Sequence, residues 1–386
     1  MQKSNWVLAS SNSSRKVDAL IIGGGIIGLA IGYYLSKRNF YDVEIVEREK
    51  QLTPHASGHN AGGISGIHTY QPPETWPLFR EAQKLYEQLA ESSGFEFEYV
   101  KGGTITPGTQ ESEKEFDQIA LKYADHREGV FVNFLSKTEL QNKEPNLSTE
   151  RFSCAMYYPL DAQGNSKKLG ECFAKTCSEK GMKITTGSAV TSFDFSDGRV
   201  VRATMNNGDT IVPGNVIIAA GPWSGEVSAK LGLALPISPV KGHLISVDAG
   251  EFRLVNSFIS GPRYYVMQNG STVIVGGGED SVGFDTKVDP LRIKDAWTEG
   301  ISMVPKLGRL NEKTTSTACL RPHAAGGIPI LGKSKHRENV FFATGHFRSG
   351  FGLAPVTGKL ISQLLLDGRT EIDLSPFSPD RFLQNH

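Results

Sequence analysis

A glycine-rich turn near the N-terminus constrains the fold most strongly. The apolar run 17–22 leads into residues 23–28, with the sequence GGGIIG, and a second apolar run, 42–46, ends at Glu47. This spacing predicts a strand, a G-x-G-x-x-G turn, a helix, and a second strand that ends in an acidic residue.

Each position in this pattern has a physical role in binding an adenine dinucleotide. Gly23 makes the tight turn, Gly25 lets the backbone approach a pyrophosphate, and Gly28 lets the helix pack closely on the strand. The pyrophosphate then lies at the helix N-terminus. Glu47 can accept hydrogen bonds from a ribose diol and would repel a 2′-phosphate. The turn therefore predicts that the chain binds an adenine dinucleotide.

The uncharged stretch 19–35 is nearly long enough to be a membrane span. Three consecutive glycines at 23–25 argue against a span. A buried parallel strand followed by its crossover helix also gives a continuous apolar sequence. We therefore expect no membrane span.

The composition indicates an enzyme-sized protein of 386 residues, with room for two or three domain-sized units. A net charge of zero gives no electrostatic signal for nucleic acid or an anionic membrane. The four cysteines form no C-x-x-C pair, which favours reduced thiols and a cytoplasmic location. Residues 1–16 are polar and serine-rich, and we expect a loose tail rather than a signal peptide.

Periodicity and turn residues predict the remaining elements. Pro77 opens a helix, 167–180 has helical periodicity, and Asn207-Gly208 is a strong hairpin signal. The expected strands are 100–105, 182–185, 189–195, 200–205, 210–212, 216–221, 264–267, 272–275 and 340–345, with a final helix from Pro355 to Gly368.

Nucleotide-binding patterns thus occur at the N-terminus, in the middle and at the C-terminus, with other segments inserted between them. This arrangement suits FAD better than NAD. We predict an α/β chain, α+β overall, with an FAD-binding Rossmann-like domain (17–95, 151–225 and 335–386). A discontinuous antiparallel-sheet substrate-binding domain is expected from 96–150 and 226–334.

Three further segments carry a family resemblance: 219–224 (AAGPWS), 319–322 (CLRP) and 345–355 (GHFRSGFGLAP). Together with the glycine turn and Glu47, they make the chain similar to the D-amino acid oxidase-like flavoproteins. Within that family it resembles the glycine oxidases most, with some sarcosine oxidase-like features. The resemblance implies FAD as cofactor, with the backbone of 345–352 beside the isoalloxazine ring.

The residues expected to contact FAD lie in these segments and in a small-residue loop at 57–64, apart from Arg48 and Val190. They are Gly23, Gly25, Ile26, Ile27, Gly28, Glu47, Arg48, Ser57, Asn60, Ala61, Gly62, Val190, Ala220, Gly221, Trp223, Cys319, Gly345, His346, Arg348, Ser349, Gly350, Phe351 and Gly352.

The resemblance also implies the substrate contacts. Arg321 matches the arginine that binds the substrate carboxylate, for which a planar guanidinium is the natural partner. Tyr264 and Tyr265 match paired tyrosines of related amine oxidases, although a Tyr-Tyr pair in a strand is also typical of a core. Arg348 is expected at the flavin edge, beside His346.

The implied reaction is hydride transfer from the substrate Cα to flavin N5, followed by hydrolysis of the imino acid to an oxo acid. Such a reaction needs no strong side-chain base. The sequence shows no convincing catalytic triad, carboxylate pair or metal cluster. The expected substrate is a small amino acid or N-methyl amino acid.

Two positions bear on details that the resemblance leaves open. Cys319 stands where sarcosine oxidase-like enzymes have a cysteine bonded covalently to FAD, so it is either that attachment point or an inert buried thiol. Ile274 stands where those enzymes have a lysine that promotes reaction with oxygen. The electron acceptor is therefore oxygen or another molecule.

Other functions remain open from the sequence. A 2-hydroxy acid dehydrogenase would use the same arginine, and the chain could be the flavin subunit of an amine dehydrogenase complex. An NAD-binding module would leave the C-terminal glycine loop unexplained. The sequence also leaves open a homo-oligomer and whether 246–262 is a lid or a surface connection.

Overall fold

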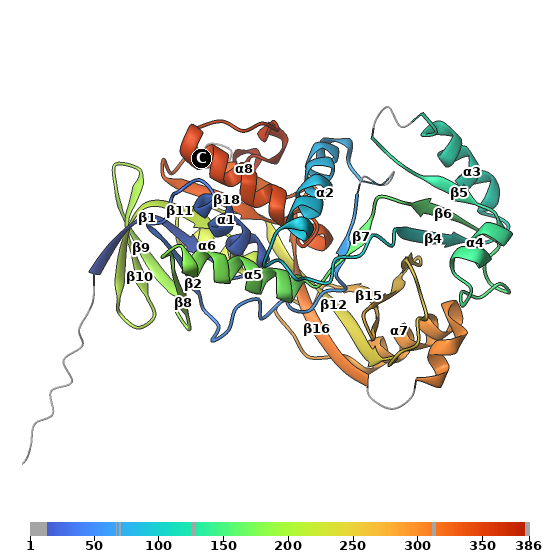
Figure 1. Cartoon of the computed structure of the whole chain (residues 1–386). Coiled ribbons are helices and arrows are strands. Elements are labelled where there is room, and N and C mark those ends of the chain that lie inside the picture. Colours follow the sequence, from blue (N-terminus) through green and yellow to red (C-terminus); the bar gives the residue numbers. More distant parts are fainter. Residues whose placement is uncertain (1–13, 67, 69–70, 126–128, 311–313, 383–386) are drawn as a thin grey trace, which may run out of the picture.

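The computed structural model describes residues 14–66, 68, 71–125, 129–310 and 314–382. Their strands form two large sheets that lie side by side, each with helices packed against it (Figure 1). The predicted α/β class, with a Rossmann-like part and an antiparallel part, is confirmed.

The chain begins with the predicted strand, turn, helix and strand: β1 (Ser14–Ile22), α1 (Ile26–Ser36) and β2 (Val43–Glu47). β1 begins at Ser14, so the last three residues of the predicted N-terminal tail belong to the sheet, while residues 1–13 lie outside the described residues. The uncharged stretch 19–35 is split between β1 and α1. Across the described residues, no helix has the length and apolar character to cross a membrane.

The first sheet has the strand order β17-β18-β11-β1-β2-β8, with β10 also paired to β11 and β9 paired to β10. β1 pairs in parallel with β2 and β11, and β11 pairs in parallel with β18. The other strands of this sheet are β8 (Lys183–Thr186), β9 (Val190–Ser196), β10 (Arg199–Met205), β11 (Thr210–Ile218), β17 (Ile330–Lys333) and β18 (Val340–Thr344).

One prediction in this region was wrong. The runs 210–212 and 216–221 were expected as separate strands, but β11 is continuous and ends at Ile218. Its first residues pair antiparallel with β10 across the predicted Asn207-Gly208 turn, and its last residues pair in parallel with β18. A single strand can therefore pair with two different strands, β10 and then β18, at successive positions along its length.

Helices cover the first sheet because its parallel strands are apolar on both faces. Ala19 and Ile21 of β1 face one core, which includes residues of α1, α2 (Trp76–Glu91), α5 (Ser166–Glu179) and α8 (Ala354–Asp367). Leu20 and Ile22 face another core, shared with β9 and β10 and flanked by α6 (Ser224–Ala229). α2 and α8 confirm two predicted helices, and α8 ends at Asp367, with Gly368 as its C-cap at a φ of 67°.

The second sheet has the order β16-β12-β15-β14-β13-β4-β6-β5. Its core is closed on one face by α7 (Pro290–Met303). Its strands are β4 (Thr104–Gly108), β5 (Asn133–Leu135), β6 (Cys154–Tyr158), β12 (Ile237–Asp248), β13 (Phe258–Ser260), β14 (Tyr264–Asn269), β15 (Thr272–Asp280) and β16 (Thr314–Ala324). The strand predicted at 100–105 lies instead at 104–108. Two short helices, α3 (Glu113–Lys122) and α4 (Lys137–Lys143), lie beside β5 and β6.

The connection between β12 and β13 is a tethered surface segment. Leu254 donates its amide to Oε1 of Gln268 at 2.7 Å, and the amides of Asn256 and Ser257 donate to the Glu144 carboxylate. Leu254 and the neighbouring Val255 are also buried in the core. These contacts favour a fixed connection over a lid.

The domain boundaries stay a prediction, and the sheets favour shifting two of them. β6 belongs to the second sheet although it follows residue 151, and β17 belongs to the first sheet although it precedes 335. A two-stranded ladder of β3 (Gly63–Ile64) and β7 (Ala162–Gln163) lies outside both sheets.

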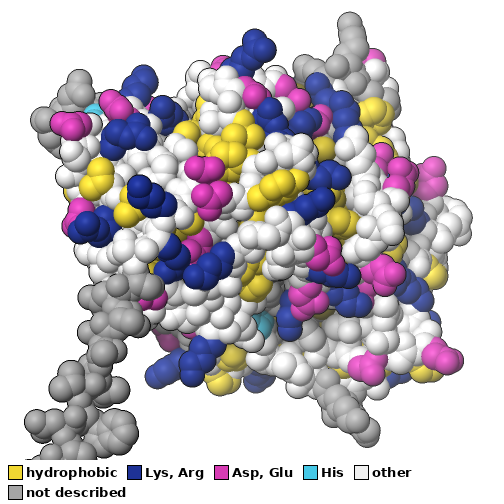
Figure 2. All heavy atoms as spheres, turned by 60° about the vertical axis from the view of Figure 1, so that its left-hand side comes forward, with side chains coloured by type: hydrophobic (Ala, Val, Ile, Leu, Met, Phe, Trp, Pro, Cys, Tyr) yellow, Lys and Arg dark blue, Asp and Glu magenta, His cyan; other side chains and the backbone are white. Residues whose placement is uncertain are grey.

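The visible surface carries both signs of charge. Figure 2 shows lysine and arginine side chains intermixed with aspartate and glutamate across one face, with apolar side chains between them. This matches the equal numbers of basic and acidic residues, 41 of each. On that face, the described residues form no broad patch of one sign.

Candidate active site

A cavity of about 690 Å³ lies where the carboxyl ends of β1, β2, β11 and β18 meet the second sheet. Ligand pockets typically measure about 300–1,000 Å³. The first sheet contributes the glycine turn at one end. The second sheet contributes residues of β12, β14, β15 and β16 at the other end. A long ligand can therefore extend from the glycine turn to the second sheet.

The glycine turn has the predicted geometry. Gly23 has a φ of 119°, and a Cβ there would lie 2.3 Å from the Ala219 carbonyl oxygen. A Cβ on Gly28 would lie 2.0 Å from the Gly23 carbonyl oxygen, so this position serves packing and does not line the cavity. At Gly25 the nearest atom is Oγ of Ser57 at 3.2 Å. The space in front of Gly25 is cavity that a side chain would fill.

Helix α1 presents its N-terminus to this part of the cavity. Gly25 is its N-cap and has no side chain to cap it, and its first turn has no acidic residue. The Ile26 amide donates to Oγ of Ser57 at 3.0 Å, and Ile26 and Ile27 line the cavity. The positive end of the helix dipole is therefore available to an anion such as a pyrophosphate.

Glu47 is buried at the edge of the same cavity, with 7% of its surface exposed. Its Oε2 accepts from the Gly24 amide at 2.8 Å, and its Oε1 accepts from the Glu49 amide at 2.9 Å. These bonds fix the carboxylate in place. Each oxygen keeps a second lone pair that can accept from a ribose hydroxyl.

The other cofactor residues predicted outside the C-terminal loop make different contacts. Arg48 lies over the Trp223 ring, 3.7 Å from its centroid, and both line the cavity. The Asn60 amide group is used within its own loop: Nδ2 donates to the carbonyls of Ala56 and Ser57, and Oδ1 accepts from the Gly62 amide. Ala61, Gly62, Val190, Ala220 and Gly221 also line the cavity.

The C-terminal glycine loop forms the opposite wall. His346, Arg348, Gly350 and Phe351 line the cavity, and a 3-10 turn, η4 (Phe347–Ser349), lies within the loop. The Tyr86 hydroxyl holds the loop by donating to the Phe351 carbonyl. Three predicted residues of this loop do not line the cavity: Gly345, Ser349 and Gly352.

Gly345 has a structural role in that loop. Its φ is 75°, and a Cβ there would lie 2.7 Å from Cβ of Ala324. The chain can therefore turn sharply at the end of β18 only with glycine at this position.

His346 is neutral because it is buried. Burial lowers its pKa to about 3, and its Nε2 lies 3.0 Å from Oγ1 of Thr357. The unfolded chain binds this proton near pH 6.5, so the stabilising contribution is fully present above that pH and is lost as the pH falls. At about pH 5.5 the free energy of unfolding should therefore fall by about 1 kcal/mol from this group alone.

Urea unfolding of flavin-containing protein at about pH 7 and about pH 5.5 measures this effect. The His346→Gln variant should lose less stability between the two pH values than the wild type. Equal losses in the two proteins would contradict a neutral buried His346.

Arg321, on β16, lines the cavity, and its guanidinium reaches over Gly242, two residues beyond its register partner on β12. A Cβ on Gly242 would lie 2.1 Å from Nη2 of Arg321, so the guanidinium occupies space that a side chain at 242 would take. Nη1 donates to the Gly278 carbonyl at 2.8 Å. Within the described part of the chain, Arg321 has no ion-pair partner. It is a partly buried cation with donors left for a carboxylate.

The structure separates the two tyrosines of β14. Tyr265 faces the same side of the sheet as Arg321: a Cβ on Gly276 would lie 2.7 Å from its hydroxyl. Burial raises the pKa of Tyr265, and the neighbouring Arg321 charge opposes the shift. The ring of Tyr264, by contrast, packs in the core that faces α7, although the residue borders the cavity. The geometry therefore favours Tyr265 alone as a substrate contact.

Cys319 lies two residues before Arg321 on β16, so the two side chains share the cavity face. It is a free thiol with 6% of its surface exposed. Burial raises the pKa of the thiol, and the Arg321 charge acts in the opposite direction. The thiol is thus held mainly in its protonated form.

Sequence reasoning missed Glu279, at the end of β15. Its Oε1 accepts from Nε of Arg348 at 2.6 Å and also pairs with Nη2 of that residue, and both residues line the cavity. The glycine triplet 276–278 directly before it was an available signal. Glycines in a strand interior often mark a close approach of backbone to a ligand.

These observations provide a test of whether the residues fit FAD. The cavity has an open cradle at Gly25, a helix N-terminus and a fixed acid at Glu47, as a dinucleotide requires. The loop 346–351 and the Arg321 guanidinium, which has no ion-pair partner among the described residues, line the rest of it. The residues present fit FAD. Within the described residues, no group of three or more His, Cys, Asp or Glu could hold a metal ion.

Comparisons with known proteins agree with this geometry. The family model of FAD dependent oxidoreductases, named DAO, matches residues 18–364. A glycine oxidase of Geobacillus kaustophilus is 31% identical over 96% of this chain and 98% of its own length. The solved structure of a glycine oxidase from that organism superposes with a TM-score of 0.85, covering 96% of this chain and 99% of that one at 28% identity.

Two more distant proteins are also similar over nearly their whole length. The hydrogen cyanide synthase subunit HcnC of Pseudomonas aeruginosa is 24% identical over 96% of this chain and 97% of its own. L-proline dehydrogenase from P. horikoshii has a TM-score of 0.86 at 20% identity, covering 96% of this chain and 99% of that one, and shares the fold.

Proposed function

Since this chain belongs to the DAO family of FAD-dependent oxidoreductases, we propose that it oxidises a small amino acid or N-methyl amino acid, of the glycine, sarcosine or D-amino acid type. The observation that carries this proposal is the Arg321 guanidinium, which lacks an ion-pair partner among the described residues and shares one cavity with the dinucleotide turn. The similarity to a glycine oxidase supports a small substrate.

In this proposal, the residues around Gly25, the N-terminus of α1 and Glu47 would hold the adenosine diphosphate half of FAD. The loop 346–351, which lines the cavity, would hold the flavin half. When bound, the flavin supplies the hydride acceptor for oxidation at the substrate Cα.

The chain's own side chains would bind and orient the substrate. Arg321 holds the carboxylate through two parallel hydrogen bonds. Tyr265 keeps its proton because burial raises its pKa, so it can donate to the same carboxylate. His346, neutral at the pH of most assays, adds no charge near the reacting atoms. The imino acid product then hydrolyses to an oxo acid and an amine.

Two alternative functions share the same cavity. A 2-hydroxy acid dehydrogenase would use Arg321 in the same way. A flavin subunit of an amine dehydrogenase complex is suggested by the similarity to HcnC, whose name describes a subunit. Ile274, on β15, does not line the cavity, so it favours neither oxygen nor another electron acceptor.

Anaerobic titration of the flavin spectrum tests the proposal. Purified protein is mixed with glycine, sarcosine, D-alanine, D-proline and the hydroxy acid glycolate. Bleaching by an amino acid but not by glycolate supports the proposal, and the reverse supports the hydroxy acid alternative. A bound flavin reduced only with a co-purified partner supports the complex. Reoxidation in air then separates oxidase from dehydrogenase.

Covalent attachment of FAD through Cys319 is a separate proposal with a direct test. The position of the thiol in the cavity supports attachment, but a raised pKa disfavours the thiolate that would react. We therefore expect acid denaturation to release all the flavin and intact-mass measurement to give the mass of the polypeptide alone. Flavin that stays with the wild-type polypeptide but not with Cys319→Ser would establish attachment instead.

A further inference from the structure

Three arginines, Arg263, Arg321 and Arg348, line the end of the cavity at the second sheet. Arg321 and Arg348 differ in their ion-pair partners. Arg321 has no ion-pair partner among the described residues, whereas Arg348 is paired with Glu279. Both Nε and Nη2 of Arg348 contact Oε1 of Glu279. A guanidinium binds a carboxylate bidentately through two such N–H groups on one edge. Glu279 therefore occupies the edge of Arg348 that would otherwise bind a substrate carboxylate.

The two guanidinium groups converge on one short segment. The Gly278 carbonyl accepts from Arg321, and the next residue, Glu279, pairs with Arg348. Both positive charges also act on the Tyr265 hydroxyl. A substrate carboxylate held by Arg321 therefore lies near Arg348 and near the negative charge of Glu279.

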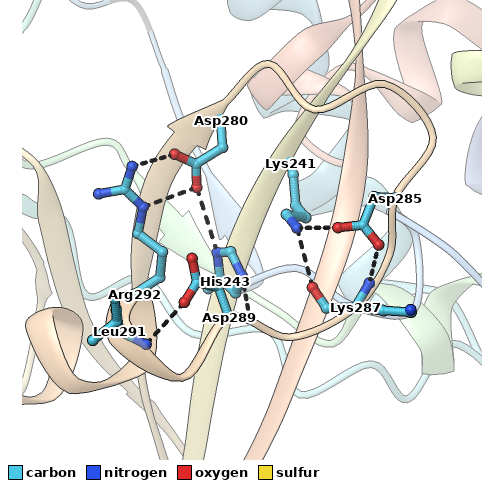
Figure 3. A network of polar contacts seen from close by, with 8 residues as sticks. All are labelled: Lys241, His243, Asp280, Asp285, Lys287, Asp289, Leu291 and Arg292. Atoms are coloured by element: carbon cyan, nitrogen blue, oxygen red, sulfur yellow. Dashed lines mark hydrogen bonds and ion pairs between the residues drawn. The ribbon is translucent and has the colours of Figure 1, made fainter.

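A second set of contacts fixes the strand end that carries Glu279 (Figure 3). The next residue, Asp280, makes two hydrogen bonds to Arg292, at 2.5 and 3.2 Å, and lies 3.9 Å from Nδ1 of the buried His243. Lys241, buried on the same strand as His243, pairs with Asp285 at 2.8 Å. The pairing of β15 with β12 is irregular between Gly277 and Asp280, and Glu279 lies in this irregular stretch. Its neighbour Asp280 is anchored by Arg292, while Glu279 itself lines the cavity.

We propose that Glu279 is a specificity-determining residue that excludes substrates with a second carboxylate. It acts in two ways: it occupies Arg348, and its own charge repels a second anion. Exclusion by an unfavourable charge is a general route to specificity. The inference rests on the proposed function and narrows its substrate class to amino acids with a single carboxylate.

An isostere that lacks one of two carboxylates allows a direct test. Iminodiacetate carries two carboxylates, and its monoamide has the same shape with one, so neither chirality nor size differs between them. The ratio of their kcat/KM values, measured by flavin reduction, reports the selectivity. Glu279→Gln should shift this ratio towards iminodiacetate by about tenfold, which corresponds to about 1.4 kcal/mol. The exposed Glu251→Gln is the matched control and should keep the wild-type ratio.

The double variant Glu279→Gln, Arg348→Gln separates the two effects. If the gain comes from a freed Arg348, the double variant should lose most of it. An unchanged ratio in Glu279→Gln would overturn the inference.

A binding measurement keeps the inference testable without turnover. Calorimetric titration with malonate and with its monoamide should show malonate binding strengthened by about tenfold, relative to the monoamide, in Glu279→Gln. If no amino acid reduces the flavin, the proposed function fails, and this titration still decides whether Glu279 masks Arg348. If wild type and Glu279→Gln had the same ratio of malonate affinity to monoamide affinity, the proposal that Glu279 masks Arg348 would be overturned.

Discussion

Replacing Arg321 with alanine should lower kcat/KM for amino acid substrates by on the order of 100-fold to 1,000-fold while leaving flavin bound. Removing one partner of a desolvated charge pair costs about 2–5 kcal/mol, and each 1.4 kcal/mol is about tenfold. The Arg321 side chain donates to the nearby Gly278 carbonyl, and its backbone pairing with β12 does not depend on the side chain, so the fold should lose little. Steady-state kinetics with the best substrate from the flavin titration measures the effect.

Two controls give this prediction its meaning. Arg321→Lys keeps the charge but removes the planar fork, and it should recover only part of the activity. Arg199→Ala removes an exposed arginine that pairs with Glu338 far from the cavity, and it should behave as the wild type. A carboxylate-free amine should be used equally poorly by wild type and Arg321→Ala. Unchanged apparent affinity for carboxylate substrates in Arg321→Ala would remove this residue from the substrate site.

The features that sequence predicted well are local ones. The turn at 23–28 was predictable because its glycines, flanking strands and Glu47 act through backbone geometry within one supersecondary unit. The resemblance to D-amino acid oxidase-like flavoproteins is also confirmed. Arg321 was assigned from that resemblance, and the structure brings it to the same cavity as the turn.

The features that sequence missed depend on contacts between distant segments. Tyr264 and Tyr265 are equivalent in sequence, and only the register of β14 against β15 decides which ring faces Arg321. The pairing of Glu279 with Arg348 joins residues 69 positions apart, one on β15 and one in the C-terminal loop. Asn60 has a suitable side chain for a ligand, but its loop uses both ends of the amide group.

The second large prediction concerns Gly25 and Gly28 of the turn, because glycine is required at these two positions for different structural reasons. Gly25 has an extended backbone, with φ −77° and ψ 176°, which alanine also adopts, and the nearest atom to an added Cβ is Oγ of Ser57 at 3.2 Å. Gly25→Ala should therefore fold. Its methyl group would occupy the cradle in front of the helix N-terminus, so FAD affinity should fall by on the order of 100-fold, or about 2.7 kcal/mol.

Gly28→Ala is the matched variant, with the same chemical change three residues later. Its Cβ would lie 2.0 Å from the Gly23 carbonyl oxygen, a backbone atom that cannot move without opening the contact between α1 and β1. We expect a loss of about 1–3 kcal/mol or more in the free energy of unfolding, as for other overpacked sites. FAD affinity and the free energy of unfolding of the apo-protein, measured on both variants, should therefore distinguish them. Gly25→Ala should lose mainly FAD affinity, and Gly28→Ala should lose mainly stability. If Gly25→Ala bound FAD as tightly as the wild type, the pyrophosphate would have to lie away from this turn, and the dinucleotide site would need to be placed elsewhere in the cavity.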